Sequence, residues 1–423
     1  MKKTLITLIL GFTTIMPVLG ETALPENRVS LPTAMEMAVN GNIGLQEKRK
    51  SLGIAKYQIK SANKLKNPQI QSNILTGKIS NANSSQVGVI LPLEIAKRGA
   101  RKDAAIVNAS AVSQSVQHYE FELKLRIRTA YFNLLQAKSE LQIMEERKEL
   151  LEEMLRLAKE KPQSSENYKI EFLQADMRLK KQLIAINRAK ANVKTARYNF
   201  NRVLNLENND TFYDSLEDSL FDKSFLNEIE VPSYDEAEKM AMEHRHDLQL
   251  AKLNIEKSKK ELQIAKRNRI PDVSVGGGYA FSMGDKSDGE HLTGAFVAVG
   301  ADMPVLYRYT PEIESAKLAI EQTELDYKAR VNITKNTLKT NYDKFLIAKE
   351  NVEHYSDILD ESKEILKLAK ARYQKGQANL MNLIINEHTH QEYLNEYINA
   401  VGVYYNTYIA ILKEMGVDSV SAL

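Results

Sequence analysis

The sequence predicts a mainly α-helical protein with a small β component, built from one helix–β-hairpin–helix unit that occurs twice. Three observations support this fold class: a pattern that repeats after about 200 residues, two very long helical stretches, and two short segments of alternating apolar and polar residues. The duplication is clearest in the first helix of each unit, where matching residues lie 203 positions apart. The matching pairs are Ala38 and Ala241, Leu45 and Leu248, and Pro68 and Pro271.

Later in each unit the same duplication continues with an offset of 211. Tyr131 and Lys138 recur at Tyr342 and Lys349, so about eight residues were inserted between the two blocks. Short solenoid repeats have periods of roughly 20–50 residues, so the longer period indicates that a whole structural unit was duplicated. We therefore divide the chain into five segments. They are a signal peptide (1–20), a first repeat (21–206), an acidic connecting segment (207–233), a second repeat (234–415) and a short C-terminal tail (416–423).

The first twenty residues have the features of a secretion signal. Lys2 and Lys3 supply the positive end, residues 5–16 are mostly apolar, and small residues precede a cleavage site after Gly20. The alternative is a membrane anchor, but an anchoring helix needs about 20 apolar residues. The chain contains no Cys, so we expect neither a lipid anchor on cysteine nor disulfide bonds.

The remaining composition excludes some classes of protein. The chain carries 58 basic and 55 acidic residues, a net charge of +3, so no strongly basic face for nucleic acid is indicated. No later run of 18 apolar residues predicts a transmembrane helix.

Each repeat begins with a helix that ends at a proline, at about residues 31–66 and 234–269. The long helices follow at about 97–161 and 312–375, each roughly 64 residues or ~95 Å long. Their apolar residues alternate spacings of three and four, which is typical of left-handed coiled coils. A returning helix then pairs with each long one.

A β-hairpin is predicted between the leading helix and the long helix of each repeat, at 69–93 and 272–305. In the second, Val273, Val275 and Tyr279 point to one face, and Ser274 and Gly276 point to the other. Strands of 9–11 residues match a tilted bilayer crossing, although an ordinary soluble hairpin is the alternative. Four strands cannot close a barrel, and open edges are not tolerated in lipid. We therefore expect several chains to pool their strands: two would give a filled barrel of eight, and three a hollow one of twelve.

The connecting segment 207–233 differs from both repeats. Its residues 207–230 hold eight acidic residues and one basic residue. It is either a surface connection wrapped around the middle of the helical body or a flexible acidic linker.

Together these features resemble the TolC-type outer-membrane efflux family, also called outer membrane factors. The resemblance extends from about residue 31 to 415 and rests on the order and spacing of motifs that are individually weak. The motifs are the helix exits Asn67-Pro68 and Ile270-Pro271, the strand ends Leu91-Pro92-Leu93 and Met303-Pro304-Val305, and the turn Ala371-Arg372-Tyr373-Gln374-Lys375-Gly376.

The resemblance implies a homotrimer in the cell outer membrane. Three chains would form a 12-stranded β-barrel in outer-membrane lipid, above an α-barrel of long coiled-coil helices in the periplasm. Such a channel is one part of a tripartite efflux or export system. It receives substrate from an inner-membrane transporter and a periplasmic adaptor (membrane fusion) protein, and it passes that substrate to the exterior through a gated tunnel.

The resemblance also implies sites at the periplasmic tip. Arg372, Tyr373, Gly376 and Gln377 match the turn at which adaptor contacts and gating interactions occur. The alternative is that Gly376 only ends a helix and Arg372 is a solvated cation. The corresponding turn of the first repeat contains Lys161 and Pro162, without the Arg-Tyr pair or the glycine.

Family members often carry an acidic ring one and two turns beyond the tip, at the aperture. Asn382 and Ile385 occupy the matching positions here, so strong cation selectivity is not expected. Glu387 and Glu171 lie nearby as further aperture-lining candidates. The position of Glu387 in the helix seam favours a buried or interhelical role equally.

The sequence shows no arrangement of catalytic, cofactor-binding or metal-binding residues, so we do not predict an enzyme and expect no cofactor. The alternative function is a periplasmic coiled-coil adaptor or scaffold protein. Such proteins usually have one helical hairpin, which fits the duplicated layout poorly.

Overall fold

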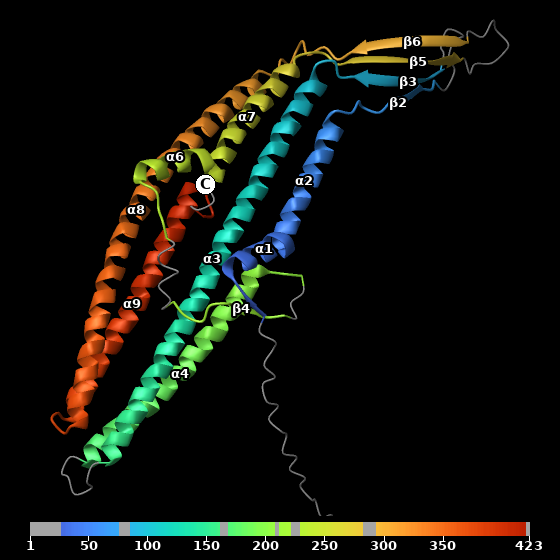
Figure 1. The fold of residues 1–423 in the computed structure, drawn as a ribbon. Helices are drawn as coiled ribbons and strands as arrows, with labels where there is room; N and C mark the ends of the chain where they lie inside the picture. The colour runs from blue at the N-terminus through green and yellow to red at the C-terminus, as the bar shows by residue number, and fades with distance from the viewer. Residues whose placement is uncertain are drawn as a thin grey trace, which may run out of the picture.

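The computed structural model describes residues 27–75, 85–160, 168–207, 211–220, 229–281 and 293–419. The chain forms a long body of helices with a small sheet at one end (Figure 1). The predicted fold class, mainly helical with few strands, is confirmed. The predicted signal peptide and the turn residues Lys161 and Pro162 lie outside the described residues.

Apart from β1, which has no counterpart in the second repeat, the helices and strands follow the same order in both repeats. The first repeat comprises β1 (Asn27–Val29), α1 (Leu31–Gly41), α2 (Ile43–Ala62), β2 (Gln69–Asn73), β3 (Ser85–Leu93), α3 (Lys97–Glu160) and α4 (Tyr168–Leu204). After β4 (Tyr213–Ser215), the second comprises α6 (Tyr234–His244), α7 (His246–Arg267), β5 (Val273–Phe281), β6 (Gly294–Ala301), α8 (Thr310–Gln374) and α9 (Leu380–Met415).

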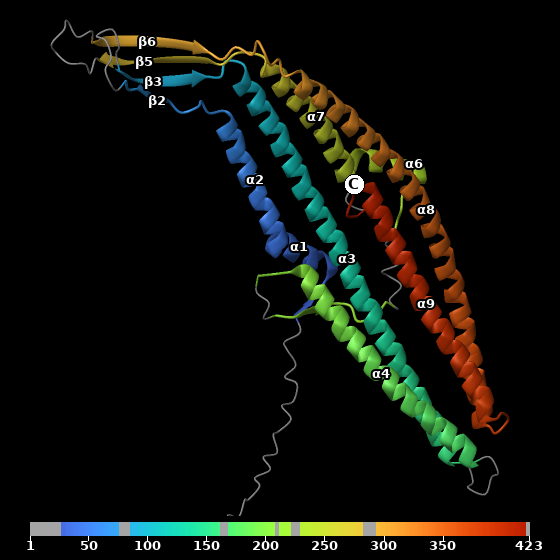
Figure 2. The ribbon, with the colours of Figure 1, turned by 180° about the vertical axis from the view of Figure 1, so that it is seen from behind.

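The two long helices α3 and α8 run almost the whole length of the body (Figure 1). Near the sheet the neighbouring helices follow the order α2, α3, α7 and α8. Farther away the order is α4, α3, α9 and α8, and the hairpins α3–α4 and α8–α9 turn at the end opposite the sheet (Figure 2). In the part of the chain that the structure describes, no helix combines the length and apolar character needed to cross a membrane.

The returning helix of each repeat docks on a bend in the leading helices. The bends are at Asn42 and Arg245, 203 positions apart, and the docking ends are at Asn205 and Gly416, 211 apart. Asn42 caps α2 by accepting the Leu45 amide (2.9 Å) and donates to the Leu204 carbonyl (2.9 Å). Asn205 and Gly416 both adopt left-handed backbone conformations, with φ of 46° and 75°. The two copies thus use the same joint with different side chains.

A second duplicated contact joins each long helix to the segment before its leading helix. The Tyr131 hydroxyl donates to the Val29 carbonyl (3.0 Å), and the Tyr342 hydroxyl donates to the Pro232 carbonyl (3.2 Å). Around Tyr131 the main core forms where α3 meets α9, and the rings of Phe132 and Tyr405 stack 4.1 Å apart.

The described part of the connecting segment packs on α3 and α4. Its strand β4 pairs in parallel with β1. The Asp214 carboxylate is buried there and is paired with Lys138 (3.0 Å) and Arg197. Residues 213–215 are therefore held firmly against the helical body.

The sheet has the order β2-β3-β5-β6, with every neighbouring pair antiparallel. Val89, Gly277 and Val297 lie opposite one another and share one face, because directly paired residues point the same way. On the other face β3 and β5 approach closely at Gly278, where a Cβ atom would lie 2.2 Å from the Val87 carbonyl oxygen. The two hairpins thus form one continuous sheet with two outer edges, β2 and β6.

Candidate functional site

The turn between α8 and α9 is closed by its own backbone. Gly376 adopts a left-handed conformation (φ 69°), which glycine accepts at little cost. Its amide donates to the Tyr373 carbonyl (3.0 Å), and the Gln377 amide donates to the Arg372 carbonyl (2.9 Å). These two bonds form a Schellman motif, which satisfies the last carbonyls of α8. Asn379 then caps α9 by accepting the Asn382 amide (3.0 Å).

Tyr373 is buried at the tip, where it connects the two helical hairpins. Its hydroxyl donates to the Glu171 carboxylate on α4 (3.4 Å). Burial, followed by the charge of Glu171, raises the pKa of the Tyr373 hydroxyl to about 12. The hydroxyl therefore remains a proton donor at neutral pH.

Arg372 and Gln377 lie on the outside of the same turn. Both side chains are exposed, and the Arg372 guanidinium forms no ion pair with a described residue of its own chain. Of the four tip residues predicted on α8 and its turn, only Tyr373 contributes its side chain to packing within the chain.

A further polar link at the tip involves two residues that were not predicted from the sequence. The Lys370 ammonium lies 2.5 Å from the Glu153 carboxylate on α3, and the Gln374 amide donates to the same carboxylate (3.3 Å). Lys370 immediately precedes the predicted turn residues 371–376, and nothing in the sequence indicated a role for it. Glu153 carries no distinguishing signal, because it stands among many acidic residues on a long helix.

An apolar cluster fills the space between the two hairpins at the tip. It joins α3, α4, α8 and α9, so the relative position of the two hairpins is set by packing as well as by Glu153. Its buried members are Leu151, Met154, Ala158, Ala175, Tyr373, Leu380, Leu383 and Ile384.

The four predicted aperture residues fall into two groups. Asn382 and Ile385 are exposed on α9. Glu171 is buried beneath Tyr373, and Glu387 has no exposed surface. Both Glu387 carboxylate oxygens accept bonds from Arg147 on α3, at 2.7 and 3.2 Å. In this conformation Glu387 holds α9 to α3 and does not line an opening.

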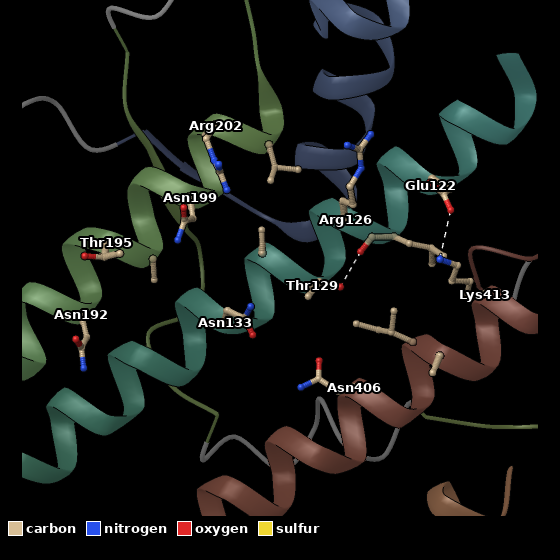
Figure 3. A pocket seen from close by; sticks show the side chains of 16 residues that line it. Glu122, Arg126, Thr129, Asn133, Asn192, Thr195, Asn199, Arg202, Asn406 and Lys413 are labelled. Carbon is tan, nitrogen blue, oxygen red and sulfur yellow. Dashed lines mark hydrogen bonds and ion pairs between the residues drawn. The ribbon is translucent and has the colours of Figure 1, made fainter. Parts of the chain in front are cut away.

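Away from the tip, an asparagine-rich groove follows the helices. One part, of about 800 Å³, lies between α3, α4 and α9 and is lined by Asn133, Asn199 and Asn406 (Figure 3). A second part, of about 490 Å³, continues toward the tip. Asn192 lines both parts, which makes them one groove. No cluster of three or more potential metal-ligating side chains occurs among the described residues.

Comparison with known proteins gives this fold a family context. Residues 238–417 match the profile of the outer membrane efflux protein family. No curated protein sequence matches the chain. The second repeat thus carries the sequence signature of the outer membrane efflux proteins, and the resemblance predicted from the sequence is confirmed.

Solved structures extend the likeness to the first repeat. A crystal structure of CusC has a TM-score of 0.75 and 13% identity, covering 93% of each chain. The CmeC outer membrane channel of Campylobacter jejuni has a TM-score of 0.73 and 15% identity, covering 98% of this chain and 94% of that chain. The open state of the Neisseria gonorrhoeae MtrE outer membrane channel has a TM-score of 0.72 and 16% identity, covering 92% and 89%. At these identities the likeness concerns the fold.

Proposed function

We propose that this chain is a subunit of a trimeric outer-membrane channel in a tripartite efflux system. It would receive substrate from an inner-membrane transporter and a periplasmic adaptor, and release it outside the cell. The observation that carries the proposal is the four-stranded sheet with two open edges on top of a long helical body. The family match over the second repeat and the fold shared with outer membrane channels support it.

We propose that the open edges of the sheet pair with further copies of the chain. Its edges β2 and β6 have no neighbouring strand among the described residues. Apolar side chains on these strands are highly exposed, with Ile70 at 81% and Val297 at 82%. Exposed apolar edge strands favour pairing with another chain. Joining β6 of one copy to β2 of the next would close a barrel whose apolar face contacts lipid.

The helical body supports the same assembly. Its two outer helices, α4 and α8, each expose large apolar side chains. Contact between α8 of one copy and α4 of the next would bury both sets. The residues are Leu173 and Met177 on α4, and Ile347, Ile365 and Leu368 on α8.

The tip is the proposed gate and adaptor contact. The bonds from Lys370 and Gln374 to Glu153, together with the Tyr373–Glu171 bond, hold the α8–α9 hairpin against the α3–α4 hairpin. An iris-like opening would slide one hairpin past the other and break them. The exposed side chains of Arg372 and Gln377 remain available to a neighbouring copy or to the adaptor.

Membrane fractionation followed by cross-linking tests the channel assignment. The processed chain should appear in detergent extracts of the outer membrane and cross-link to the mass of a trimer. A freely soluble monomer would overturn the proposal and would favour the coiled-coil adaptor alternative.

Conductance in planar bilayers tests the gate separately. Glu153→Gln should raise single-channel conductance, because it removes the charge that Lys370 and Gln374 contact at the tip. Arg372→Ala should also raise it, because we propose that the exposed guanidinium contacts a neighbouring copy in the closed trimer. Lys375→Ala, an exposed residue of the same turn, provides the control. Unchanged conductance in both variants would remove these contacts from the gate.

A further inference from the structure

The asparagine-rich groove lies on the face of the helices opposite β1 and β4. On α3, Tyr131 and Lys138 face these strands. Asn133 and Glu140, which line the groove, come two residues after each of them and therefore point about 200° away around the helix. Strands packed across the helices would obstruct a tunnel if they lay inside it. In the proposed trimer β1 and β4 must therefore lie outside, and the groove lines the interior.

The groove is rich in side chains that form hydrogen bonds without carrying charge. Amide groups both donate and accept, so they replace part of the hydration shell of a polar solute. Among the residues that line the groove there is no aromatic side chain to favour a flat apolar molecule. Six asparagines contribute: Asn133, Asn192, Asn199, Asn395, Asn399 and Asn406.

The charged side chains of the groove are mostly basic. Glu122 is paired with Lys413 (3.4 Å), and burial raises the pKa of the Glu140 carboxyl. Arg188 and Arg202 form no ion pair with any described residue, so their charge faces the groove uncompensated. The five basic residues are Arg126, Lys181, Arg188, Arg202 and Lys413, and the two acidic residues are Glu122 and Glu140.

We propose that the tunnel interior prefers anions and that its cargo is a negatively charged, hydrophilic solute. This inference rests on the proposed channel function, which makes the groove an interior surface. Walls of low dielectric constant concentrate the field of such charges, and three copies repeat the basic excess around one axis. Pores lined by Arg and Lys favour anions in the same way.

The reversal potential of the reconstituted full-length channel under a KCl gradient tests the inference. With the natural chain, the reversal potential should have the same sign as the equilibrium potential of chloride. The double variant Arg188→Gln/Arg202→Gln should shift it toward potassium. Lys190→Gln is the matched control, because Lys190 lies on the same helix and pairs with Glu145 (3.6 Å), outside the groove. Citrate added on the tip side should reduce the chloride current, and less so in the double variant.

The outcomes separate this inference from the proposed function. Channels with a potassium preference, or with none, would overturn the anion preference while leaving the channel assignment intact. The same shift in Lys190→Gln and in the double variant would also overturn it, because the groove would then have no special part. Failure to form any channel, despite trimers of normal mass, would contradict the channel function itself.

Discussion

At the scale of single residues, the ion pair between the partly exposed Arg147 and the fully buried Glu387 joins α3 to α9. Glu387 has no exposed surface, and Arg147 neutralises it with two hydrogen bonds. Removing one partner of such a pair leaves a buried charge uncompensated, which costs about 3–5 kcal/mol.

Arg147→Ala should therefore lower the free energy of unfolding by about that amount. The double variant Arg147→Met/Glu387→Leu should recover most of the loss, because neither charge remains buried. Thermal unfolding of the detergent-solubilised protein measures both. Equal losses in the single and the double variant would show that the pair matters through its shape alone.

His390 makes stability depend on pH. Burial, followed by the charge of Lys363, lowers the pKa of the imidazole from 6.5, against the opposing effect of Glu387 and Glu146. The unfolded chain then binds the proton more readily than the folded chain. The stability contributed by the neutral imidazole is fully present above pH 6.5 and is lost as the pH falls toward the lowered pKa.

The temperature at the unfolding midpoint should therefore decrease as the pH is lowered from 7.5 to 5.5. His390→Gln should make this decrease smaller. His246, whose pKa is also lowered by burial, should retain the remainder. The exposed His354 on α8 provides the control, and His354→Gln should leave the pH dependence unchanged. A decrease of full size in His390→Gln would rule out this assignment.

At the scale of helices and strands, Gly376 and Gly416 end α8 and α9 in the same way but differ in their surroundings. Gly376 and Gly416 both have positive φ, which costs a residue with a side chain roughly 1–2 kcal/mol. A Cβ atom at Gly376 would meet nothing within 4 Å. At Gly416 it would lie 2.8 Å from the backbone of Arg245.

Gly416→Ala should therefore destabilise the protein more than Gly376→Ala does. The first substitution forces α9 away from the α6–α7 bend, whereas the second adds only backbone strain at an exposed turn. Thermal unfolding of the two variants side by side measures the difference. Equal midpoints would mean that the docking of α9 on Arg245 adds nothing to stability.

Elements of regular period were predictable, and their contacts were not. The alternation from Val273 to Tyr279 predicted a strand, and the Arg-Tyr-Gln-Lys-Gly turn predicted the end of α8. The docking of Asn42 on Leu204 was not predicted, because the two residues are 162 positions apart. A single asparagine in a helical segment also forms no periodic pattern that would indicate a contact. Glu153 was missed for the same reason, since nothing local distinguishes it from other acidic residues of α3.

At the scale of the whole molecule, assembly depends on the outer helices. Leu368 is 59% exposed on α8 and is proposed to contact α4 of the next copy. Leu368→Glu should lower the trimer fraction, because it would place a charge in an apolar contact. Lys367→Glu, at the exposed neighbouring position, is the control and should leave the trimer intact.

Cross-linking and size-exclusion chromatography in detergent measure the trimer fraction, and circular dichroism checks that helix content is unchanged. An unaffected trimer in Leu368→Glu would place the contact between copies elsewhere on the body.

By itself the sequence determined the elements and their duplication: helices from spacings of three and four, strands from alternation, and two units from matching residues 203 and 211 positions apart. These patterns are local or internal to the chain, so they can be recognised without knowing which segments contact one another. Only the tertiary structure decided which faces meet. It buried Glu387 against Arg147, left Asn382 exposed, and turned the asparagine-rich groove away from β1 and β4. Such outcomes depend on residues far apart in the chain, where periodicity identifies a face but not the surface that covers it.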